Sequence, residues 1–375
     1  MNSIEIKEVK TQSQWRAFVY LPEKIYAQNP HWTPPLYMDE ERFFKPEKNP
    51  AFAQNESILL LAYKNQKVVG RVMGIVPTKF NQSKNQNCAR FAYLDCFEDF
   101  EVFSSLINAV KRWAKSRNCD ELIGPMGFSD KEPQGFLIKG FNEPSMMVTA
   151  NNPAYLPQFI EKMKFKPFVR LMEYDVPLSA SIVARFQRLN QLILEKHKLH
   201  LHEFHRTREV RPFVSSVFDL INETYQNIYG FSAVSEAEKK EFATRFLPLL
   251  NPKLIKIVTD SSGKVVAFVV AMPDLSKGIK KARGRILPFG WWHLFRAFKK
   301  SKRLVLLLGA VAEPLQGKGV DAILGASLIS SALSLGFTVM DSHLIMEENL
   351  KMRREIERIS GSRLYKEFQI YHQKI

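Results

Sequence analysis

A short glycine-rich stretch, Gln316-Gly-Lys-Gly-Val320, contains the residues best suited to hold a specific ligand. An apolar run of strand character, 305–312, precedes it, and a helical pattern starts at Asp321. This order predicts unpartnered amides at a helix N-terminus, where the helix dipole favours negative charge. We therefore expect the amides of 317–320 to bind phosphate, with added charge from Lys318. A plain strand-to-helix turn is the alternative interpretation.

The elements that position this stretch occur twice along the chain, which predicts an internal duplication. Each half has a helical pattern, a hairpin rich in β-branched residues, a further strand, a long helix, a strand, another helix and a closing strand. The helical patterns before the hairpins are 14–28 in the first half and 210–227 and 235–249 in the second, and the hairpins are 58–77 and 254–273. The next strands are 90–96 and 304–312, the long helices 101–118 and 321–335, the strands after them 121–125 and 338–346, and the closing strands 168–176 and 362–371. We expect a boundary near Pro177, with a connecting helix over 179–196, and hence domains 1–177 and 178–375.

This element order resembles the GNAT superfamily of acyl-CoA N-acyltransferases. The phosphate loop of that family has Arg or Gln, then Gly three residues later, then Gly or Ala; Gln316 and Gly319 match, and Asp321 departs from the pattern. The resemblance implies an α/β fold of two tandem domains with mixed sheets. It also implies acetyl-CoA or another acyl-CoA as substrate, an amine acceptor in the groove between the halves, and no metal. The residues implied in coenzyme binding are Gly309, Ala310, Val311, Ala312, Gln316, Gly317, Lys318, Gly319, Val320 and Asn349.

The first half resembles the family in element order only. At the place of its loop stands Cys96-Phe-Glu-Asp-Phe-Glu101, which has no glycine and three acids. Those acids should repel phosphate, so we expect a degenerate copy that supports the second half.

The candidate catalytic groups are fewer. Glu313 is a candidate general base, although a solvated residue at a strand end is the simpler interpretation. Tyr229 is a second candidate, with packing as the alternative. Members of the family often have a Tyr that protonates the leaving thiolate. The matching position in this chain is near Ile356, so that acid is missing. His200, His202 and His205 are expected at the surface and not on a metal.

A basic and aromatic insertion spans 277–303. It contains ten Lys or Arg residues and no acid, with five aromatic residues interleaved (Phe289, Trp291, Trp292, Phe295 and Phe298). Three interpretations stay open: a helix on an anionic membrane surface, a segment that packs on the body or covers the substrate groove, and a nucleic-acid contact, which is the least favoured.

The composition suits a protein that binds anions. The 375 residues have a formal net charge of +16, and the 45% hydrophobic content is that of a globular protein. Cys88, Cys96 and Cys119 read as free thiols in a reducing compartment. The N-terminus does not resemble a signal peptide, and the uncharged run 322–340 reads as a buried helix and strand. We expect a cytoplasmic protein, with a peripheral position at the inner face of the membrane as the alternative. A non-catalytic coenzyme A- or lipid-binding protein is the rival function.

Overall fold

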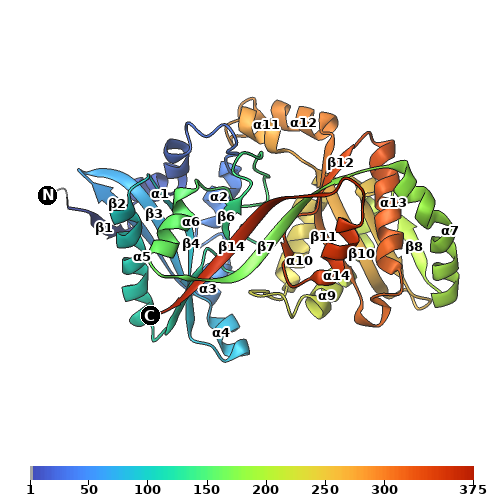
Figure 1. Cartoon of the computed structure of the whole chain (residues 1–375), viewed down its shortest axis with the longest axis horizontal. Coiled ribbons are helices and arrows are strands. Elements are labelled where there is room, and N and C mark those ends of the chain that lie inside the picture. The colour runs from blue at the N-terminus through green and yellow to red at the C-terminus, as the bar shows by residue number, and fades with distance from the viewer. Residues whose placement is uncertain (1–2) are drawn as a thin grey trace.

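One 14-stranded mixed sheet runs through the whole molecule, with helices on both of its faces (Figure 1). The computed structural model describes residues 3–375, except for the side chains of 182 and 185–189. The strand order is β1-β2-β3-β4-β5-β14-β7-β12-β11-β10-β9-β8, with β6 paired to β14 and β13 paired to β7. The α/β fold with mixed sheets, predicted from the sequence, is confirmed.

The first half contains the elements up to Pro177. They are β1 (Glu5–Glu8), α1 (Gln12–Ile25), α2 (Tyr37–Phe43), α3 (Ala51–Gln54), β2 (Glu56–Lys64), β3 (Lys67–Val76), α4 (Thr78–Lys84), β4 (Cys88–Cys96), α5 (Phe100–Lys115), β5 (Glu121–Gly124), β6 (Phe136–Lys139), α6 (Tyr155–Lys162) and β7 (Lys166–Pro177).

The second half follows a connecting helix, α7 (Ala180–His197). Its further elements are β8 (His200–Glu203), α8 (Thr207–Val210), α9 (Val214–Thr224), α10 (Glu236–Glu241), β9 (Ile255–Thr259), β10 (Val265–Pro273), α11 (Ser276–Lys281), α12 (Gly290–Lys300), β11 (Arg303–Val311), α13 (Val320–Ser334), β12 (Val339–Asp341), β13 (Ile345–Met346), α14 (Leu350–Glu357) and β14 (Arg363–Lys374).

The two halves exchange their last strands. Strand β14 crosses to the first half and pairs with β5, where Tyr371 lies opposite Gly124. Strand β7 crosses the other way and pairs with β12, where Asp175 lies opposite Asp341. The two long strands also pair with each other, so the halves share one sheet (Figure 1). The division at 177/178 stays a prediction, because the sheet continues across it.

The hydrophobic pattern explains which helices line the sheet. Helix α5 has one apolar stripe at helical spacing, which includes Val102, Leu106 and Val110, and it buries that stripe on the first half. Helix α13 is apolar nearly all round, because it is packed between α7 on one side and strands β9 and β10 on the other. That double burial accounts for the uncharged run at 322–340. Within residues 3–375, no helix is both long enough and apolar enough to cross a bilayer.

Two predicted elements differ from the structure. The strand expected over 338–346 is broken into β12 and β13, because His343 has a φ of 56° that a continuous strand does not allow. The helix expected over 235–249 keeps α-helical geometry only to Glu241. A π-helical turn, Phe242–Phe246, and a 3-10 turn, Leu247–Leu249, follow it, and Pro248 lies inside the second turn.

Candidate functional site

The predicted coenzyme residues lie along a V-shaped opening in the second half of the sheet. Strand β11 pairs with β12 only from Arg303 to Val305. Beyond that point β11 stays with β10 as far as Val311, whereas the continuation of β12 stays with β7 through Ile345. The two strands therefore diverge, and the peptide groups of 306–311 on this side have no neighbouring strand. An extended ligand can lie there as a strand would.

The glycine-rich loop stands at the open end of this V. A 3-10 turn, Glu313–Leu315, follows β11, and Gly317 and Gly319 have φ values of 73° and 84°. Helix α13 starts at Val320 without a side-chain cap, and its first hydrogen bond joins the N–H of Ile323 to the Gly319 oxygen at 3.2 Å. The Lys318 N–H already donates to the Leu315 oxygen at 3.2 Å, whereas the amides from Gly319 to Ala322 have no acceptor among the described residues and are available to an anion.

Residue 319 also favours glycine, mainly through its positive φ of 84°. A Cβ atom on Gly319 would lie 2.7 Å from Cδ1 of Ile193, which belongs to α7. The positive φ excludes most other residues too. Gly317, in contrast, would meet no atom within 4 Å. Helix α7 thus sets how closely the loop approaches the start of α13.

A tyrosine reaches into the V from α9. The Tyr225 hydroxyl donates to the Gly309 oxygen at 2.9 Å and accepts from the Gly309 N–H at 3.3 Å. Burial raises the Tyr225 pKa to about 12, so the hydroxyl is protonated at neutral pH. It occupies the peptide groups that an extended ligand along β11 would use.

The corresponding place in the first half is closed. The Asp99 carboxylate accepts from the N–H groups of Glu101 and Val102, which caps α5, and Lys64 pairs with it at 2.6 Å. Tyr155 donates to the Cys96 oxygen at 2.7 Å, and Met126 N–H donates to the Phe91 oxygen at 2.9 Å. Groups of the protein itself therefore bond to the strand β4 where β11 of the second half is open. A carboxylate already holds the amides that would bind a phosphate.

The structure brings most of the predicted coenzyme residues to one edge of the second half. Gln316 and Lys318 are exposed, and the Gln316 amide donates to the Val311 oxygen at 3.1 Å. Asn349 begins the helix after the V, as predicted, and its side chain accepts from Met352 N–H. Asp321 is exposed in the first turn of α13, and Ile356 is buried in the core.

The two catalytic candidates lie apart from each other. Glu313 is exposed beside the loop. Tyr229 packs between Phe80 and Phe168 of the first half, and its hydroxyl has no hydrogen-bond partner among the described residues. Burial raises the Tyr229 pKa. Neither lies on β11, and their catalytic roles stay predictions.

A buried polar group at the vertex of the V escaped the sequence analysis. Asp341 ends β12 with no exposed surface, accepts from the Tyr365 hydroxyl, and lies in the same sheet as Glu173 and Lys366, which pair at 3.4 Å. Burial and the neighbouring Asp341 raise the Glu173 pKa. The sequence held no clear signal for this group, because β7 and β14 contain several charged residues and only the strand exchange brings β7, β12 and β14 together.

His343 directly follows this group on the β12 arm of the V. Its N–H donates to Asp341 at 2.8 Å, and its Nδ1 is buried without a partner among the described residues. Burial lowers the His343 pKa, which Asp341 opposes, so the imidazole is neutral at neutral pH. A neutral ring nitrogen without a partner can accept a proton.

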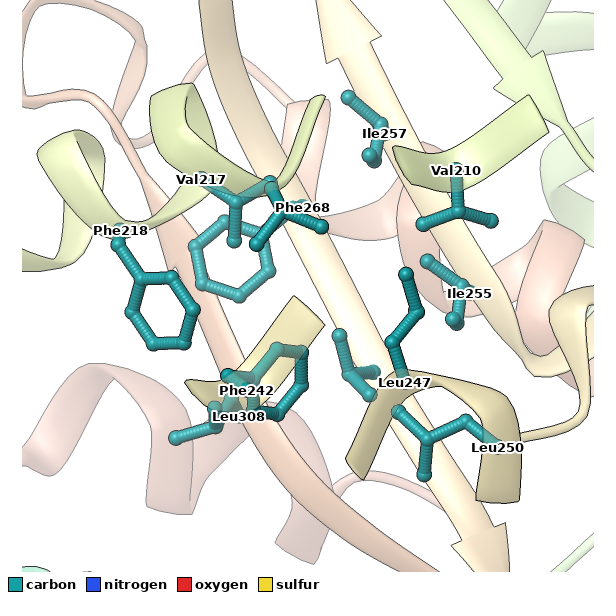
Figure 2. Close-up of a pocket in the computed structure, with 12 residues that line it drawn as sticks. Val210, Val217, Phe218, Phe242, Leu247, Leu250, Ile255, Ile257, Phe268 and Leu308 are labelled. Atoms are coloured by element: carbon teal, nitrogen blue, oxygen red, sulfur yellow. The ribbon is translucent and has the colours of Figure 1, made fainter. Parts of the chain in front are cut away.

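An apolar cavity lies under α8 and α9, on the face of β9, β10 and β11 (Figure 2). It measures about 30 Å³, room for only a water or two, and Leu308 in its wall is the neighbour of Gly309 in the V. The lining is wholly hydrophobic: Val210, Val214, Val217, Phe218, Phe242, Leu247, Leu250, Ile255, Ile257, Phe268, Val270 and Leu308. The roof is the irregular segment 242–250, so the cavity borders the least regular backbone of this half.

Other predicted features have simple structural roles. The three cysteines are buried free thiols, as expected. His202 lies 2.8 Å from the Thr259 hydroxyl, and the described residues contain no cluster of three potential metal ligands.

Comparison with known proteins places the fold. No family model matches the chain. It is 25% identical over 381 residues to a protein of Caulobacter vibrioides named Bacterial ceramide synthase, covering 99% of this chain and 98% of that one. It is 24% identical to Protein YghO of Escherichia coli, covering 99% of this chain and 95% of that one.

Solved structures show the same duplicated architecture. A tandem GNAT protein from the clavulanic acid biosynthesis pathway aligns with a TM-score of 0.55 at 11% identity, over 99% of this chain and 98% of that one. A GCN5-related glucosamine N-acetyltransferase region in a fungal multi-domain β-N-acetylglucosaminidase aligns at 0.54 and 11% identity; this chain covers 38% of that protein. The chain therefore has the tandem GNAT fold, as its element order predicted.

Proposed function

We propose that the protein transfers an acyl group from acyl-CoA to an amine, with the second half binding the coenzyme. The observation that carries the proposal is the contrast between the two helix N-termini: α5 is capped by Asp99, whereas α13 begins at Gly319 without a cap. Only the second half offers free amides at the open end of a V, and the tandem GNAT fold and the name of the Caulobacter relative support the reaction class.

The loop and strand β11 bind different parts of the coenzyme. The amides of Gly317, Gly319 and Val320 hold the pyrophosphate, and the peptide groups of Gly309 and Val311, on the side of β11 away from β10, receive the pantetheine arm. This arrangement puts the thioester near the vertex of the V, where β11 and β12 separate. Fixing the donor there supplies much of the rate, because the acceptor then meets a carbonyl held in place.

The proton acceptor in this proposal is His343, two residues after Asp341 at the vertex of the V. The amine nitrogen attacks the thioester carbonyl, the C–S bond breaks, the coenzyme leaves as a thiolate, and the proton released from the amine passes to Nδ1 of His343. Its lowered pKa keeps it unprotonated near neutral pH, and a thiolate leaves without a dedicated acid. Glu313, exposed next to the pyrophosphate loop, is less well placed for this role.

The transferred acyl group has a long hydrocarbon chain and is not acetyl. The cavity beside Leu308 has a wholly apolar lining, and a ceramide, the product that the Caulobacter relative is named for, contains a fatty acyl amide. A chain entering the cavity requires the 242–250 roof to move outward, which its π-helical and 3-10 turns favour over a regular helix.

The experiment has two stages. Calorimetric titration with coenzyme A and with acetyl, octanoyl and palmitoyl thioesters measures binding. A thiol-release assay with short amines and long-chain amino alcohols then measures transfer. One coenzyme per chain and release that depends on an amine support the proposal, and faster release from the longer thioesters supports the hydrocarbon preference. Binding without amine-dependent release favours the non-catalytic coenzyme-binding alternative.

A further inference from the structure

Helix α12 presents an aromatic face to solvent. Trp291, Trp292 and Phe295 are 52%, 51% and 48% exposed, and Leu287 and Phe289, just before the helix, are 78% and 76% exposed. The three helical residues fall on one side of α12. Trp292 packs on both Trp291 and Phe295, and together with Leu287 and Phe289 they make five exposed apolar side chains in nine residues, which a monomeric soluble protein rarely leaves open.

The opposite side of α12 is the one that packs. Gly290 is buried, and Ala297 faces α11, where a Cβ on Gly278 would lie 2.7 Å from both the Ala297 Cβ and the His293 oxygen. A surface helix normally buries its large apolar residues and exposes its polar ones. Helix α12 instead packs through small residues and turns its aromatic residues outward. About half of each side chain at Trp291, Trp292 and Phe295 stays exposed, which argues against the interpretation in which these residues serve mainly to pack on the body.

The segment is held firmly between the two halves and is not a free arm. The Gly284 oxygen accepts from Tyr37 N–H at 2.9 Å, and Arg285 pairs with Glu23 at 2.6 Å, both in the first half. Figure 1 shows α11 and α12 side by side along one edge of the molecule, above the junction of the halves. These contacts anchor the segment just before the aromatic residues to the first half.

The same segment concentrates positive charge. It contains ten Lys or Arg residues and no acid, and within residues 3–375 only Arg285 and Arg303 among them form ion pairs with described side chains. Eight cations are left without a carboxylate partner: Lys277, Lys280, Lys281, Arg283, Arg296, Lys299, Lys300 and Lys302. Exposed aromatic residues surrounded by unpaired cations match the headgroup and acyl boundary of an anionic bilayer.

We propose that residues 277–303 dock the protein on the surface of an anionic lipid bilayer, with Phe289, Trp291, Trp292 and Phe295 inserted between headgroups. A second copy of the chain would oppose one set of cations with another, because the segment has no acid of its own. Nucleic acid would use the cations but gives no reason for a bulky apolar patch that includes Leu287 and Phe289.

The geometry also fixes the orientation of the site. The insertion enters β11 at Arg303, and the coenzyme loop follows its other end at Val311. Nine residues of strand at about 3.3 Å each place the loop roughly 30 Å along β11 from the docked end. The pyrophosphate site would stay in water while the vertex of the V is nearer the lipid.

Vesicle co-sedimentation tests this without any thioester, so its failure leaves the acyl-transfer proposal standing. The protein is mixed with vesicles of phosphatidylcholine and phosphatidylglycerol, and with vesicles of phosphatidylcholine alone. We expect at least about tenfold stronger binding to the anionic vesicles, weakened by salt. Equal binding to both vesicles, or no binding to either, overturns the proposal.

Matched variants separate the patch from general surface effects. Trp291→Ser with Trp292→Ser and Phe295→Ser should weaken binding at least about tenfold, whereas Met38→Ser with Leu249→Ser, also exposed apolar positions, should not. Lys299→Glu with Lys300→Glu should weaken it likewise, and Lys67→Glu with Lys253→Glu should not. Thermal unfolding checks that each variant is folded. Sedimentation of the triple variant like wild type, duplex DNA binding in place of vesicle binding, or loss of a dimer in the triple variant would each contradict membrane docking.

Discussion

The Tyr225 hydroxyl is bonded to both peptide groups of Gly309, at 2.9 Å to the oxygen and 3.3 Å from the N–H. It therefore holds a part of β11 that the proposed pantetheine path needs. A ligand along this strand has to displace the hydroxyl, and that displacement costs binding energy. Tyr225 therefore competes with the coenzyme for the peptide groups of Gly309.

Replacement of Tyr225 by Phe should tighten coenzyme A binding. One net hydrogen bond of about 1 kcal/mol corresponds to a roughly fivefold lower Kd, measured by calorimetry. The matched control is Tyr155→Phe, which removes the bond to the Cys96 oxygen in the first half and should leave the Kd unchanged. Weaker binding by Tyr225→Phe would mean that the hydroxyl belongs to the site.

A methyl group at Gly319 should disrupt the loop. The Cβ would lie 2.7 Å from Ile193 at a φ of 84°, so Gly319→Ala should weaken coenzyme binding at least about tenfold and cost about 1–3 kcal/mol of stability. Gly325→Ala, in the interior of α13 with open space around it, should stabilise by about 0.5–1 kcal/mol and bind normally. If both variants bind alike, the loop is not the pyrophosphate site.

Loss of the Asp99 carboxylate should affect folding and not binding. Asp99→Ala removes the cap of α5 and the ion pair with Lys64, which should lower the free energy of unfolding by about 0.5–2 kcal/mol in urea titrations. The stoichiometry of coenzyme A should stay at one per chain. A second equivalent bound by wild type would refute the view that the first half is closed.

The activity should depend on His343 in a characteristic way. Because burial lowers its pKa, the imidazole is already neutral near pH 7, and kcat should fall only toward acid. His343→Gln should lower kcat about a hundredfold and abolish that acid limb, with KM for the thioester little changed. An unaltered pH profile would exclude His343 as the proton acceptor, whereas equal loss in binding would indicate a structural role.

Glu132 should contribute stability that is lost as the pH rises from about 4.5 to 7. Burial raises the Glu132 pKa to about 7 from 4.5, while its acceptance of the Ser129 N–H opposes the shift. Between about pH 4.5 and 7 the folded carboxyl keeps a proton that the unfolded chain has lost, so stability is present at the acid side and declines toward pH 7. The free energy of unfolding, measured by urea titration at several pH values, should decline less for Glu132→Gln than for wild type, by at most about 3 kcal/mol. Parallel curves would contradict the assignment.

The sequence predicted what is local. The strand, loop and helix around Gly317 and Gly319 follow from turn chemistry and hydrophobic periodicity, and the acids of 96–101 predicted an unsuitable loop in the first half. The Asp99 cap itself appears only in three dimensions.

Turn chemistry and hydrophobic periodicity could not predict contacts between residues far apart in the sequence. The exchange of β7 and β14 depends on pairing between residues such as Tyr371 and Gly124. Tyr225 and Gly309 are 84 residues apart in sequence, and no periodicity joins them. The sequence identified the aromatic residues of 289–298 but not which of them face solvent, because close packing at Gly278 decides which side of α12 meets the body.

The most direct test of the central claim is a crystal structure of the protein with coenzyme A. We expect electron density for the pyrophosphate within hydrogen-bonding distance of the amides of Gly317, Gly319 and Val320, and pantetheine along β11 with Tyr225 displaced from Gly309. Coenzyme bound at the start of α5, or a saturating soak that leaves the loop of the second half empty, would contradict it.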